Sequence, residues 1–337
     1  MASMSPVGAY RHGGRLREAA AAFPHAPTPW LDLSTGINPV PWRGPRAAWS
    51  DLARLPDPAE IADLERIAAG AFGVDDPRRV LATAGAEAGL RLLPAVIGGA
   101  DVAIVSPTYS CHETAWRLAA RPVAAVSLEA AFEAVASVLV IVNPNNPDGR
   151  RTERAALLDL AMIRSRSGLW TVVDESFVEA SPELSVAGAA IEHLIVLRSF
   201  GKFYGLPGVR LGFIVAEPVV IERLQALQGD WPISADAMAI GRAAYLDETW
   251  RGQTRERLER DAHALDKLLA AHGLTVIGGT SLFRLISTPS VSVLFEALCE
   301  QGILTRPFQD AEDRLRIGVP REAGLARLAA ALEGLKS

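Results

Sequence analysis

Short apolar runs alternate with longer amphipathic segments over the first two thirds of the chain. Seven of these runs predict strands, at 79–83, 101–106, 123–127, 138–143, 170–174, 194–198 and 211–216. The run 138–142 is apolar without alternation, which is typical of a central parallel strand with both faces covered. A helical period follows at 153–166, with Thr152 as its predicted N-cap. The pattern predicts an α/β fold with a mostly parallel seven-stranded sheet.

The pattern changes after residue 216. Two long amphipathic helices are expected at 217–228 and 236–271, and a last helix is expected at 322–335. Short strands are predicted between them, at 274–277, 282–287 and 315–317. We therefore expect three parts: an N-terminal arm (1–45) that packs on the active site and small domain, a large domain (46–220) and a smaller α+β C-terminal domain (221–337).

Composition narrows the class of protein. The chain has 49% hydrophobic and 22% charged residues and a net charge of −5, which fits a globular protein and disfavours a nucleic-acid binder. No apolar stretch is long enough to cross a membrane. Cys111 and Cys299 are the only cysteines and have no metal-ligand spacing, so we expect no disulfide framework, no metal site and a cytoplasmic location.

Lysine is rare in this chain. Only Lys202, Lys267 and Lys336 are lysines among 34 basic residues. Lys202 follows a predicted strand and has apolar and glycine neighbours, surroundings that would depress its pKa and leave a nucleophilic amine. The alternative is that Lys202 is an ordinary surface lysine. This interpretation is weaker here, because arginine occupies nearly all the other basic positions.

Three further clusters follow predicted strands. They are Asn143-Pro144-Asn145-Asn146-Pro147-Asp148-Gly149, Val172-Val173-Asp174-Glu175 and Thr83-Ala84-Gly85-Ala86-Glu87. Each has a structural alternative: a turn, a carboxylate that caps the next helix, and an ordinary helix start. Because open α/β sheets bind ligands at their strand ends, four such clusters in one chain predict a single ligand site.

Together these motifs resemble the fold-type I pyridoxal 5′-phosphate (PLP) enzymes, the aspartate aminotransferase superfamily, over nearly the whole chain. The resemblance implies that Lys202 forms the Schiff base with the cofactor, that Asp174 pairs with its pyridine nitrogen and that Asn146 contacts its ring hydroxyl. It further implies an aromatic residue stacked on the ring, phosphate donors and an arginine for the substrate carboxylate. The stacked aromatic residue is Tyr109, and the arginine is Arg316. The phosphate donors are Gly85, Ala86, Glu87, Ser199 and Arg210.

Two N-terminal motifs and the lysine segment indicate the branch. The chain has His12-Gly13-Gly14, then Leu31-Asp32-Leu33-Ser34-Thr35-Gly36-Ile37-Asn38-Pro39, and the lysine segment R-S-F-G-K-F-Y-G-L-P-G-V-R-L-G. They are similar to the threonine-phosphate decarboxylase branch of cobalamin biosynthesis, the CobC subgroup. This likeness implies a phosphorylated amino acid substrate, with His12 contacting its phosphate and Gly36, Ile37 and Asn38 lining the pocket.

Other interpretations stay open. The histidinol-phosphate aminotransferase branch usually has tyrosine where this chain has Phe177, and a module without turnover is a third possibility. Gly201 and Leu55 replace a hydroxyl residue and a tyrosine that most relatives direct to the cofactor phosphate. The resemblance implies a homodimer. We expect the triplet Cys111-His112-Glu113 to be structural, because adjacent side chains point in different directions.

Overall fold

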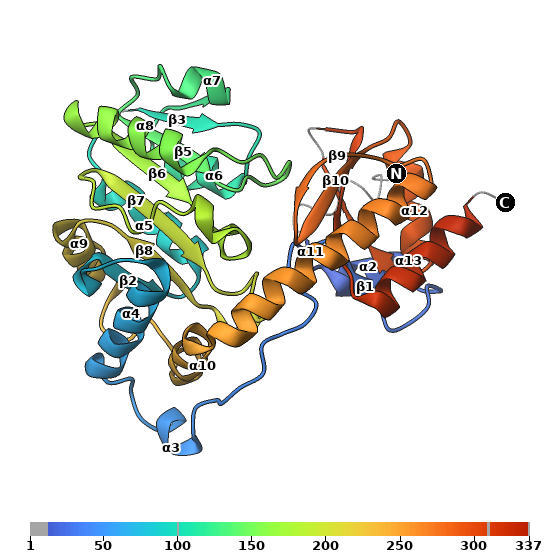
Figure 1. The fold of residues 1–337 in the computed structure, drawn as a ribbon, viewed down its shortest axis with the longest axis horizontal. Coiled ribbons are helices and arrows are strands. Elements are labelled where there is room, and N and C mark those ends of the chain that lie inside the picture. Colours follow the sequence, from blue (N-terminus) through green and yellow to red (C-terminus); the bar gives the residue numbers. More distant parts are fainter. Residues whose placement is uncertain (1–12, 100, 309–310, 336–337) are drawn as a thin grey trace. The chain divides into compact units, whose positions relative to one another are not determined.

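The computed structural model describes residues 13–99, 101–308 and 311–335, which form two compact units (Figure 1). The large unit comprises 41–146 and 150–252. The small unit comprises the described parts of 1–40, 147–149 and 253–337. Each unit has its own sheet and its own hydrophobic core.

The large unit contains a seven-stranded sheet in the order β2-β8-β7-β6-β5-β3-β4. Its strands are β2 (Val80–Thr83), β3 (Val102–Val105), β4 (Val123–Val126), β5 (Val138–Val142), β6 (Trp170–Asp174), β7 (Leu194–Ser199) and β8 (Gly212–Val215). All neighbours pair in parallel except those of β8, which runs antiparallel to both β2 and β7. The prediction of a mostly parallel seven-stranded sheet is confirmed, with β8 as the reversed strand.

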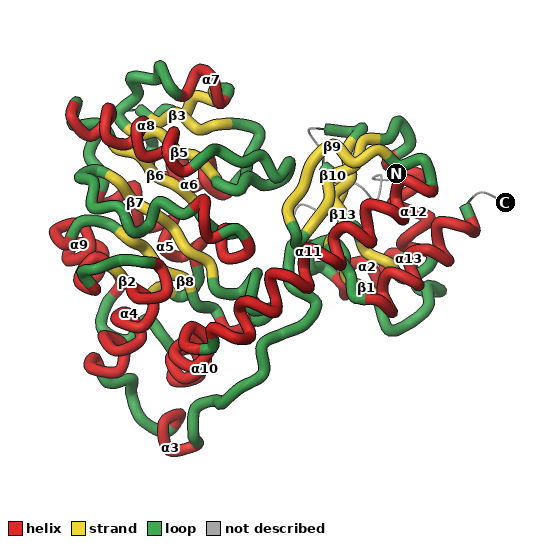
Figure 2. The backbone as a smooth tube through the Cα atoms, in the orientation of Figure 1, coloured by secondary structure: helices red, strands yellow, loops and turns green. Residues whose placement is uncertain are grey.

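Burial explains why these runs form strands. Every residue of β5 is buried, as the run without alternation predicts for a central strand covered on both faces (Figure 2). The edge strand β2 is protected differently, because Glu65 accepts a hydrogen bond from the N–H of Ala82 and Gln228 donates one to its carbonyl. Side chains thus occupy hydrogen-bonding groups that an edge strand leaves open to another chain.

Helices surround this sheet (Figures 1 and 2). They are α3 (Trp49–Leu52), α4 (Pro58–Phe72), α5 (Ala86–Val96), α6 (Cys111–Leu118), α7 (Leu128–Ala131), α8 (Arg154–Arg166), α9 (Pro218–Gln228) and α10 (Ala235–Leu246), with short 3₁₀ turns η1 (Pro77–Arg79), η2 (Val178–Ala180), η3 (Pro182–Leu184) and η4 (Pro207–Val209). Capping residues set the ends of these helices. The N-cap of α4 is Asp57, whose carboxylate accepts the N–H of Ala59, and its C-cap is Gly73, which has φ of 70°.

Two expectations about helix ends are wrong. Thr152 does not cap α8, since the N-cap is Glu153. Thr152 instead exchanges two hydrogen bonds with the Asn143 side chain. The expected helix 236–271 is two helices, α10 and α11 (Glu248–Ala271), because the Asp247 carboxylate accepts the N–H of Trp250 at the break and is fixed there by the Trp42 indole N–H.

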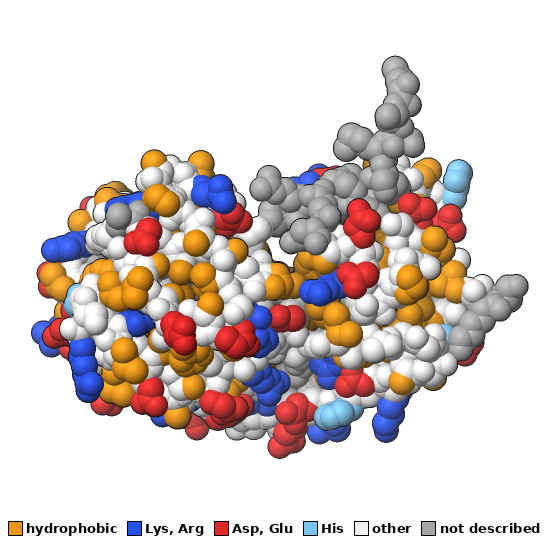
Figure 3. All heavy atoms as spheres, turned by 90° about the horizontal axis from the view of Figure 1, so that it is seen from above, with side chains coloured by type: hydrophobic (Ala, Val, Ile, Leu, Met, Phe, Trp, Pro, Cys, Tyr) orange, Lys and Arg blue, Asp and Glu red, His pale blue; other side chains and the backbone are white. Residues whose placement is uncertain are grey.

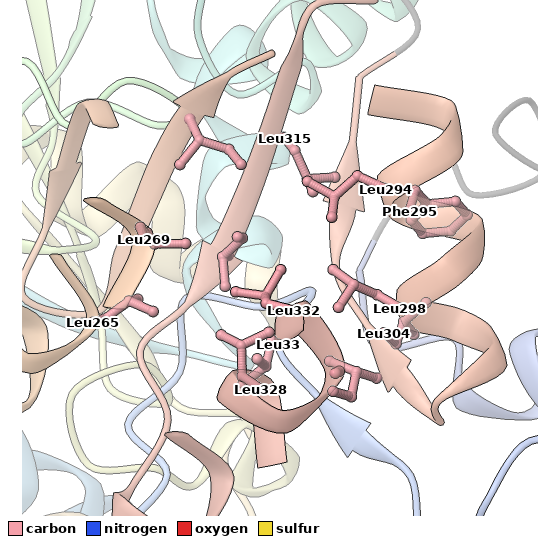
Figure 4. Close-up of a cluster of buried hydrophobic side chains, with 14 of the residues drawn as sticks. Leu33, Leu265, Leu269, Leu294, Phe295, Leu298, Leu304, Leu315, Leu328 and Leu332 are labelled. Carbon is pink, nitrogen blue, oxygen red and sulfur yellow. The ribbon is translucent and has the colours of Figure 1, made fainter. Parts of the chain in front are cut away.

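The small unit contains a four-stranded antiparallel sheet in the order β12-β13-β10-β9 and a parallel pair, β1-β11. The strands are β1 (Leu31–Asp32), β9 (Thr275–Thr280), β10 (Phe283–Ser287), β11 (Ile303–Leu304), β12 (Arg306–Pro307) and β13 (Arg314–Gly318). Its helices are α2 (Leu16–Ala22), α11 from Gln253 onward, α12 (Val291–Glu300) and α13 (Glu322–Gly334). Leucines and Phe295 from three of these helices pack with Leu33, Leu304 and Leu315 (Figure 4).

The bounds of the compact units differ from the predicted segments at three places. Residues 41–45, predicted as part of the arm, group with the large unit. Residues 221–252 group with the seven-stranded sheet, since α10 packs on α4 and α9 packs on α5. Residues 147–149 group with the small unit because their backbone lies against β9. A Cβ atom on Gly149 would be 2.1 Å from the carbonyl oxygen of Gly279.

Basic and acidic side chains are interspersed on the face drawn in Figure 3. In the described part of the chain, no helix is both long and apolar enough to span a membrane.

Candidate functional site

The topology of the large unit brings the four predicted clusters to one edge of its sheet. Thr83, Asn143, Asp174 and Ser199 end or directly follow β2, β5, β6 and β7. Because β8 is antiparallel to both β2 and β7, these two strands point the same way, and β5 and β6 are parallel to β7. The carboxyl ends of all four strands therefore lie at one edge, where such sheets bind ligands.

Asp174 is the most deeply held charge at this edge. Its Oδ2 lies 2.9 Å from Nε2 of His112, and both side chains are buried. Burial alone would raise the pKa of Asp174, but the hydrogen bond from His112, the charge of Lys202 and hydrogen bonds from Ser176 hold it at about 2. The carboxylate is thus ionised at neutral pH, and His112 donates its Nε2–H to it.

His112 is a site residue that the sequence analysis missed. Its neighbours fit the expected structural role, since Glu113 pairs with Arg117 on the exposed side of α6 and the Cys111 thiol is buried. His112, however, contacts a residue 62 positions away in the sequence. A helical period carries no signal for such a contact.

Lys202 lies in the turn that follows β7. Its Nζ is 4.8 Å from the ring centroid of Phe177, which is buried. The aromatic residues on either side of it, Phe200 and Phe203, are buried and anchor the turn. The structure thus places a primary amine near the Asp174 carboxylate, whose pKa its charge lowers.

A cradle for an anion lies at the start of α5. Gly85 has φ of +93° and is the N-cap of that helix, where the first backbone N–H groups point out of the helix end toward an anion. A Cβ atom on Gly85 would lie 2.5 Å from Nη2 of Arg210, and one on Gly212 would lie 2.3 Å from the Ala86 nitrogen. Ser199 pairs with Gly212 across β7 and β8, so the predicted phosphate-binding residues converge here.

Glu87 and Tyr109 are linked at the same helix end. The Tyr109 hydroxyl donates to Oε2 of Glu87 over 3.3 Å, and Oε1 of Glu87 pairs with Arg91 at 2.9 Å. The Arg91 partner lowers the pKa of Glu87, and burial raises the pKa of Tyr109. The Glu87 carboxylate is therefore engaged by its neighbours, and its predicted contribution to a phosphate site rests on its backbone N–H.

The three asparagines after β5 differ in their roles. Asn143 exchanges hydrogen bonds with Thr152, and Asn145 bonds with Thr108 and the Pro107 carbonyl, so both shape the turn. Asn146 is half-buried at the same turn. The turn interpretation thus applies to two of them, and Asn146 remains the predicted ligand residue.

The small unit holds the residues predicted to bind substrate. Arg316 is buried in β13 and donates to the Ser34 carbonyl over 2.9 Å. Burial and the neighbouring charge of Arg306 lower the pKa of Arg316 to about 10, against the opposing charge of Asp32, so it stays charged at neutral pH. Arg306 lies directly opposite Arg316 across β12 and β13. The sequence analysis missed Arg306, because only the strand register reveals this pairing.

The N-terminal loop lies against the same strand. Gly36 is buried and Ile37 half-buried, while Oδ1 of Asn38 accepts hydrogen bonds from Arg257 and from the Val40 N–H. The Asn38 side-chain amide oxygen thus holds the loop in place. His12 lies outside the described residues.

No group of three or more His, Cys, Asp or Glu side chains in the described part of the chain could hold a metal ion. All predicted cofactor residues belong to the large unit. All predicted substrate residues within the described ranges belong to the small unit.

Comparison with known proteins identifies the family. The family model described as aminotransferase class I and II matches residues 11–332. The chain belongs to the class I and II aminotransferase family. Among curated members, threonine-phosphate decarboxylase of Pseudomonas aeruginosa is 40% identical over 330 residues, which cover 96% of this chain and 98% of that protein. Threonine-phosphate decarboxylase of Sinorhizobium sp. is 41% identical, covering 95% and 97%.

More distant family members include proteins of both names. Threonine-phosphate decarboxylase of Salmonella typhimurium is 29% identical, covering 96% of this chain and 96% of that protein. Histidinol-phosphate aminotransferase of Geobacter sp. is 26% identical, covering 91% of this chain and 92% of that protein. Two solved structures share the fold. L-threonine-O-3-phosphate decarboxylase from Porphyromonas gingivalis has a TM-score of 0.78 at 22% identity, covering 91% of this chain and 99% of that chain. Histidinol-phosphate aminotransferase from Sinorhizobium meliloti, in complex with pyridoxal-5′-phosphate, has a TM-score of 0.81 at 17% identity, covering 99% of each.

Proposed function

We propose that the protein is a PLP-dependent threonine-phosphate decarboxylase of cobalamin biosynthesis. The substrate would be L-threonine O-3-phosphate and the product (R)-1-amino-2-propanol O-2-phosphate. The observation that carries the cofactor assignment is the buried Asp174 carboxylate, kept ionised by His112 near the primary amine of Lys202. The support for the substrate is the 40–41% identity to proteins of that name.

The residues at the sheet edge fit PLP. An ionised buried carboxylate suits a protonated pyridine nitrogen, and the Gly85 cradle with Arg210 suits a phosphate. Lys202 supplies the amine to which the cofactor aldehyde would bind, and Tyr109 and Asn146 would contact the ring and its hydroxyl. Bound PLP supplies an electron sink for the negative charge left at Cα when one of its bonds breaks.

Each residue then has a defined task. The Asp174 carboxylate would keep the ring nitrogen protonated, and His112 would hold that carboxylate in place. Lys202 would hold a proton near Cα and deliver it there once the substrate carboxylate has left as CO2. Which bond at Cα would break depends on how the substrate is oriented, so the residues that hold its carboxylate and phosphate would decide the outcome.

Orientation falls to the small unit. Threonine phosphate carries a carboxylate and a phosphate, and Arg316 and Arg306 on facing strands provide two guanidinium groups for anions. We assign the carboxylate to Arg316 and the phosphate to His12, with Arg306 as a second cation. Gly36, Ile37 and Asn38 would line the pocket.

The rival function is amine transfer in the manner of histidinol-phosphate aminotransferase. Phe177, beside Lys202, is an argument against this rival, because the aminotransferase branch usually has a tyrosine there and a phenylalanine cannot donate a hydrogen bond to the ring hydroxyl. The test supplies the purified PLP-loaded protein with threonine phosphate, free threonine or histidinol phosphate and measures CO2 release and keto-acid consumption. CO2 release from threonine phosphate alone is expected. Transamination without CO2 would contradict the proposal, and absence of any borohydride-reducible cofactor would contradict both enzymatic readings.

We also propose a cytoplasmic homodimer. Trp49 and Leu55, on and near α3, are 84% and 63% exposed, and such apolar side chains fit an interface with a second copy. Light scattering after size exclusion tests this, with a dimer mass expected. The proposed functional divisions are 46–220 for the cofactor domain, 221–337 for the small domain and 1–45 for the arm, whereas by their contacts 41–45 and 221–252 pack with the large unit.

A further inference from the structure

A buried ion network lies directly beside the candidate cofactor residues. Arg198 is 3% exposed, its Nη1 lies 2.8 Å from Oε2 of Glu175, and its Nη2 bonds with Glu179. The guanidinium carbon lies 4.3 Å from the centroid of the Phe72 ring. Both carboxylates are buried as well. One guanidinium thus ties two acidic side chains together in the buried interior of the unit.

The surrounding contacts make this network rigid. The two Glu175 oxygens accept hydrogen bonds from the Val186 N–H and from the Ser185 hydroxyl, which also lies 3.0 Å from Arg198. Arg251 approaches Glu179 to 3.8 Å. Glu175 is therefore held on both oxygens, and Glu179 lies between two cations.

The position of this network in the sheet is specific. Glu175 directly follows Asp174 at the end of β6, and Arg198 is the penultimate residue of β7, four positions before Lys202. Asp174 pairs with Leu197 in the strand register, and the N–H of Glu175 donates to the Leu197 carbonyl. Successive side chains point to opposite faces of a sheet, so the Arg198–Glu175 pair lies behind the face that presents Asp174 to His112.

Stability alone is a poor reason for such a network. Removing charges from water is costly, and apolar residues of similar volume often serve as well or better than a buried ion pair. What apolar packing does not provide is a fixed direction between two strand ends. A guanidinium that binds carboxylates at two of its nitrogens does provide a fixed direction, because its planar shape sets the angle of each hydrogen bond.

We propose that Arg198 is a positioning residue: through Glu175 and Glu179 it fixes the ends of β6 and β7, and thereby the placement of Asp174 relative to Lys202. This inference rests on the cofactor roles proposed above for those two residues. Arg198 itself takes no part in the chemistry and lies behind the site.

The test compares the same substitution at two buried arginines. Arg198→Lys keeps the charge and loses the fork. Arg164→Lys makes the same change at a 3% exposed arginine of the same unit, whose guanidinium donates to the carbonyls of Ala134, Ala136 and Trp170. Each PLP-loaded protein is examined for its unfolding temperature, for the pH midpoint of the visible absorbance of its cofactor, and for kcat and KM.

For Arg198→Lys we expect a shifted pH midpoint and a kcat lowered about 10-fold or more with KM within about two-fold, since small misplacements of reacting groups are costly. Arg164→Lys should lower the unfolding temperature and leave the midpoint and kcat at parent values. A folded Arg198→Lys with the parent midpoint and kcat, or equal changes in both variants, would overturn the inference.

A second variant covers the case in which Arg198→Lys does not fold. Glu175→Gln with Arg198→Met removes both charges of the pair and leaves Glu179 with Arg251, and it is judged by the same two criteria. If this variant also fails to fold, the network is a folding element and the inference is wrong. Lys202→Ala separates the two proposals: if it retains a borohydride-reducible cofactor, the proposed function fails, whatever Arg198 does.

Discussion

The two units hold their candidate charges in different ways. In the large unit, the ionised Asp174 carboxylate is stabilised by its surroundings, with His112 on one oxygen and Lys202 nearby. In the small unit, Arg316 and Arg306 lie on facing strand positions, and the charge of Arg306 adds to burial in lowering the pKa of Arg316. A balanced site suits a cofactor that stays bound, whereas a site with excess positive charge suits an anionic substrate that comes and goes. Changes in the large unit should therefore affect cofactor retention and kcat, and changes in the small unit should affect KM.

The largest effect is expected from Lys202→Ala. This change removes the amine to which the cofactor would bind, and activity should fall by about a thousand-fold or more, as for other residues that act in a unit. Absorbance spectra and borohydride reduction measure cofactor retention, and circular dichroism checks the fold. Lys267→Ala, at an exposed lysine of α11, is the matched control and should behave as the parent. Undiminished turnover in Lys202→Ala would contradict the assignment of cofactor binding to the large unit.

Asp174→Asn should follow. It removes the charge that would keep the cofactor nitrogen protonated while preserving shape, so we expect kcat to fall by about a hundred-fold, the usual order for loss of one electrostatic contact in a site. KM should change little, because the small unit would still hold the substrate. Stopped-flow absorbance and steady-state rates measure this, with Asp159→Asn on the exposed side of α8 as control. A raised KM at unchanged kcat would assign Asp174 to the substrate instead.

The small-unit counterpart is Arg316→Gln. Losing a charged hydrogen-bonding partner costs about 1.5–3 kcal/mol, so KM for threonine phosphate should rise about 10–100-fold. Arg306→Gln should give a smaller rise in the same direction, and neither variant should alter the absorbance of the bound cofactor. Arg321→Gln, at an exposed arginine next to α13, is the control. Loss of cofactor absorbance in Arg316→Gln would contradict the proposed division, in which the large unit binds the cofactor and the small unit binds the substrate.

The smallest effect concerns stability of the large unit alone. Burial raises the pKa of Glu65 to about 7, against the hydrogen bond from Ala82. The folded protein thus binds this proton more tightly than the unfolded chain, and stability falls as pH rises from about 4.5 through 7. Glu65→Gln keeps the acceptor without the charge, so its unfolding temperature should exceed that of the parent at pH 8 by about 2–4 °C and match it near pH 4.5. Glu222→Gln, exposed on α9, should keep the parent's pH dependence.

The sequence predicted what depends on local pattern. The seven strands of the large unit were found because each is a short apolar run bounded by turn residues, and the clusters at their ends were visible as sequence. The break between α10 and α11 was missed because Asp247 is fixed by Trp42, far away in the chain. His112 and Arg306 were missed for a similar reason: the first acts through a contact across the fold, and the second through strand register.

The scarcity of lysine has a consequence at Arg316. Burial and the charge of Arg306 lower the pKa of Arg316 to about 10, which leaves the guanidinium charged at neutral pH. The pKa of a lysine in water is about 10.4. The same burial and neighbouring charge would lower it enough to leave the amine partly neutral in mildly alkaline solution. Arginine therefore gives the small unit a guanidinium that stays charged in mildly alkaline solution. Its affinity for an anion should be retained there.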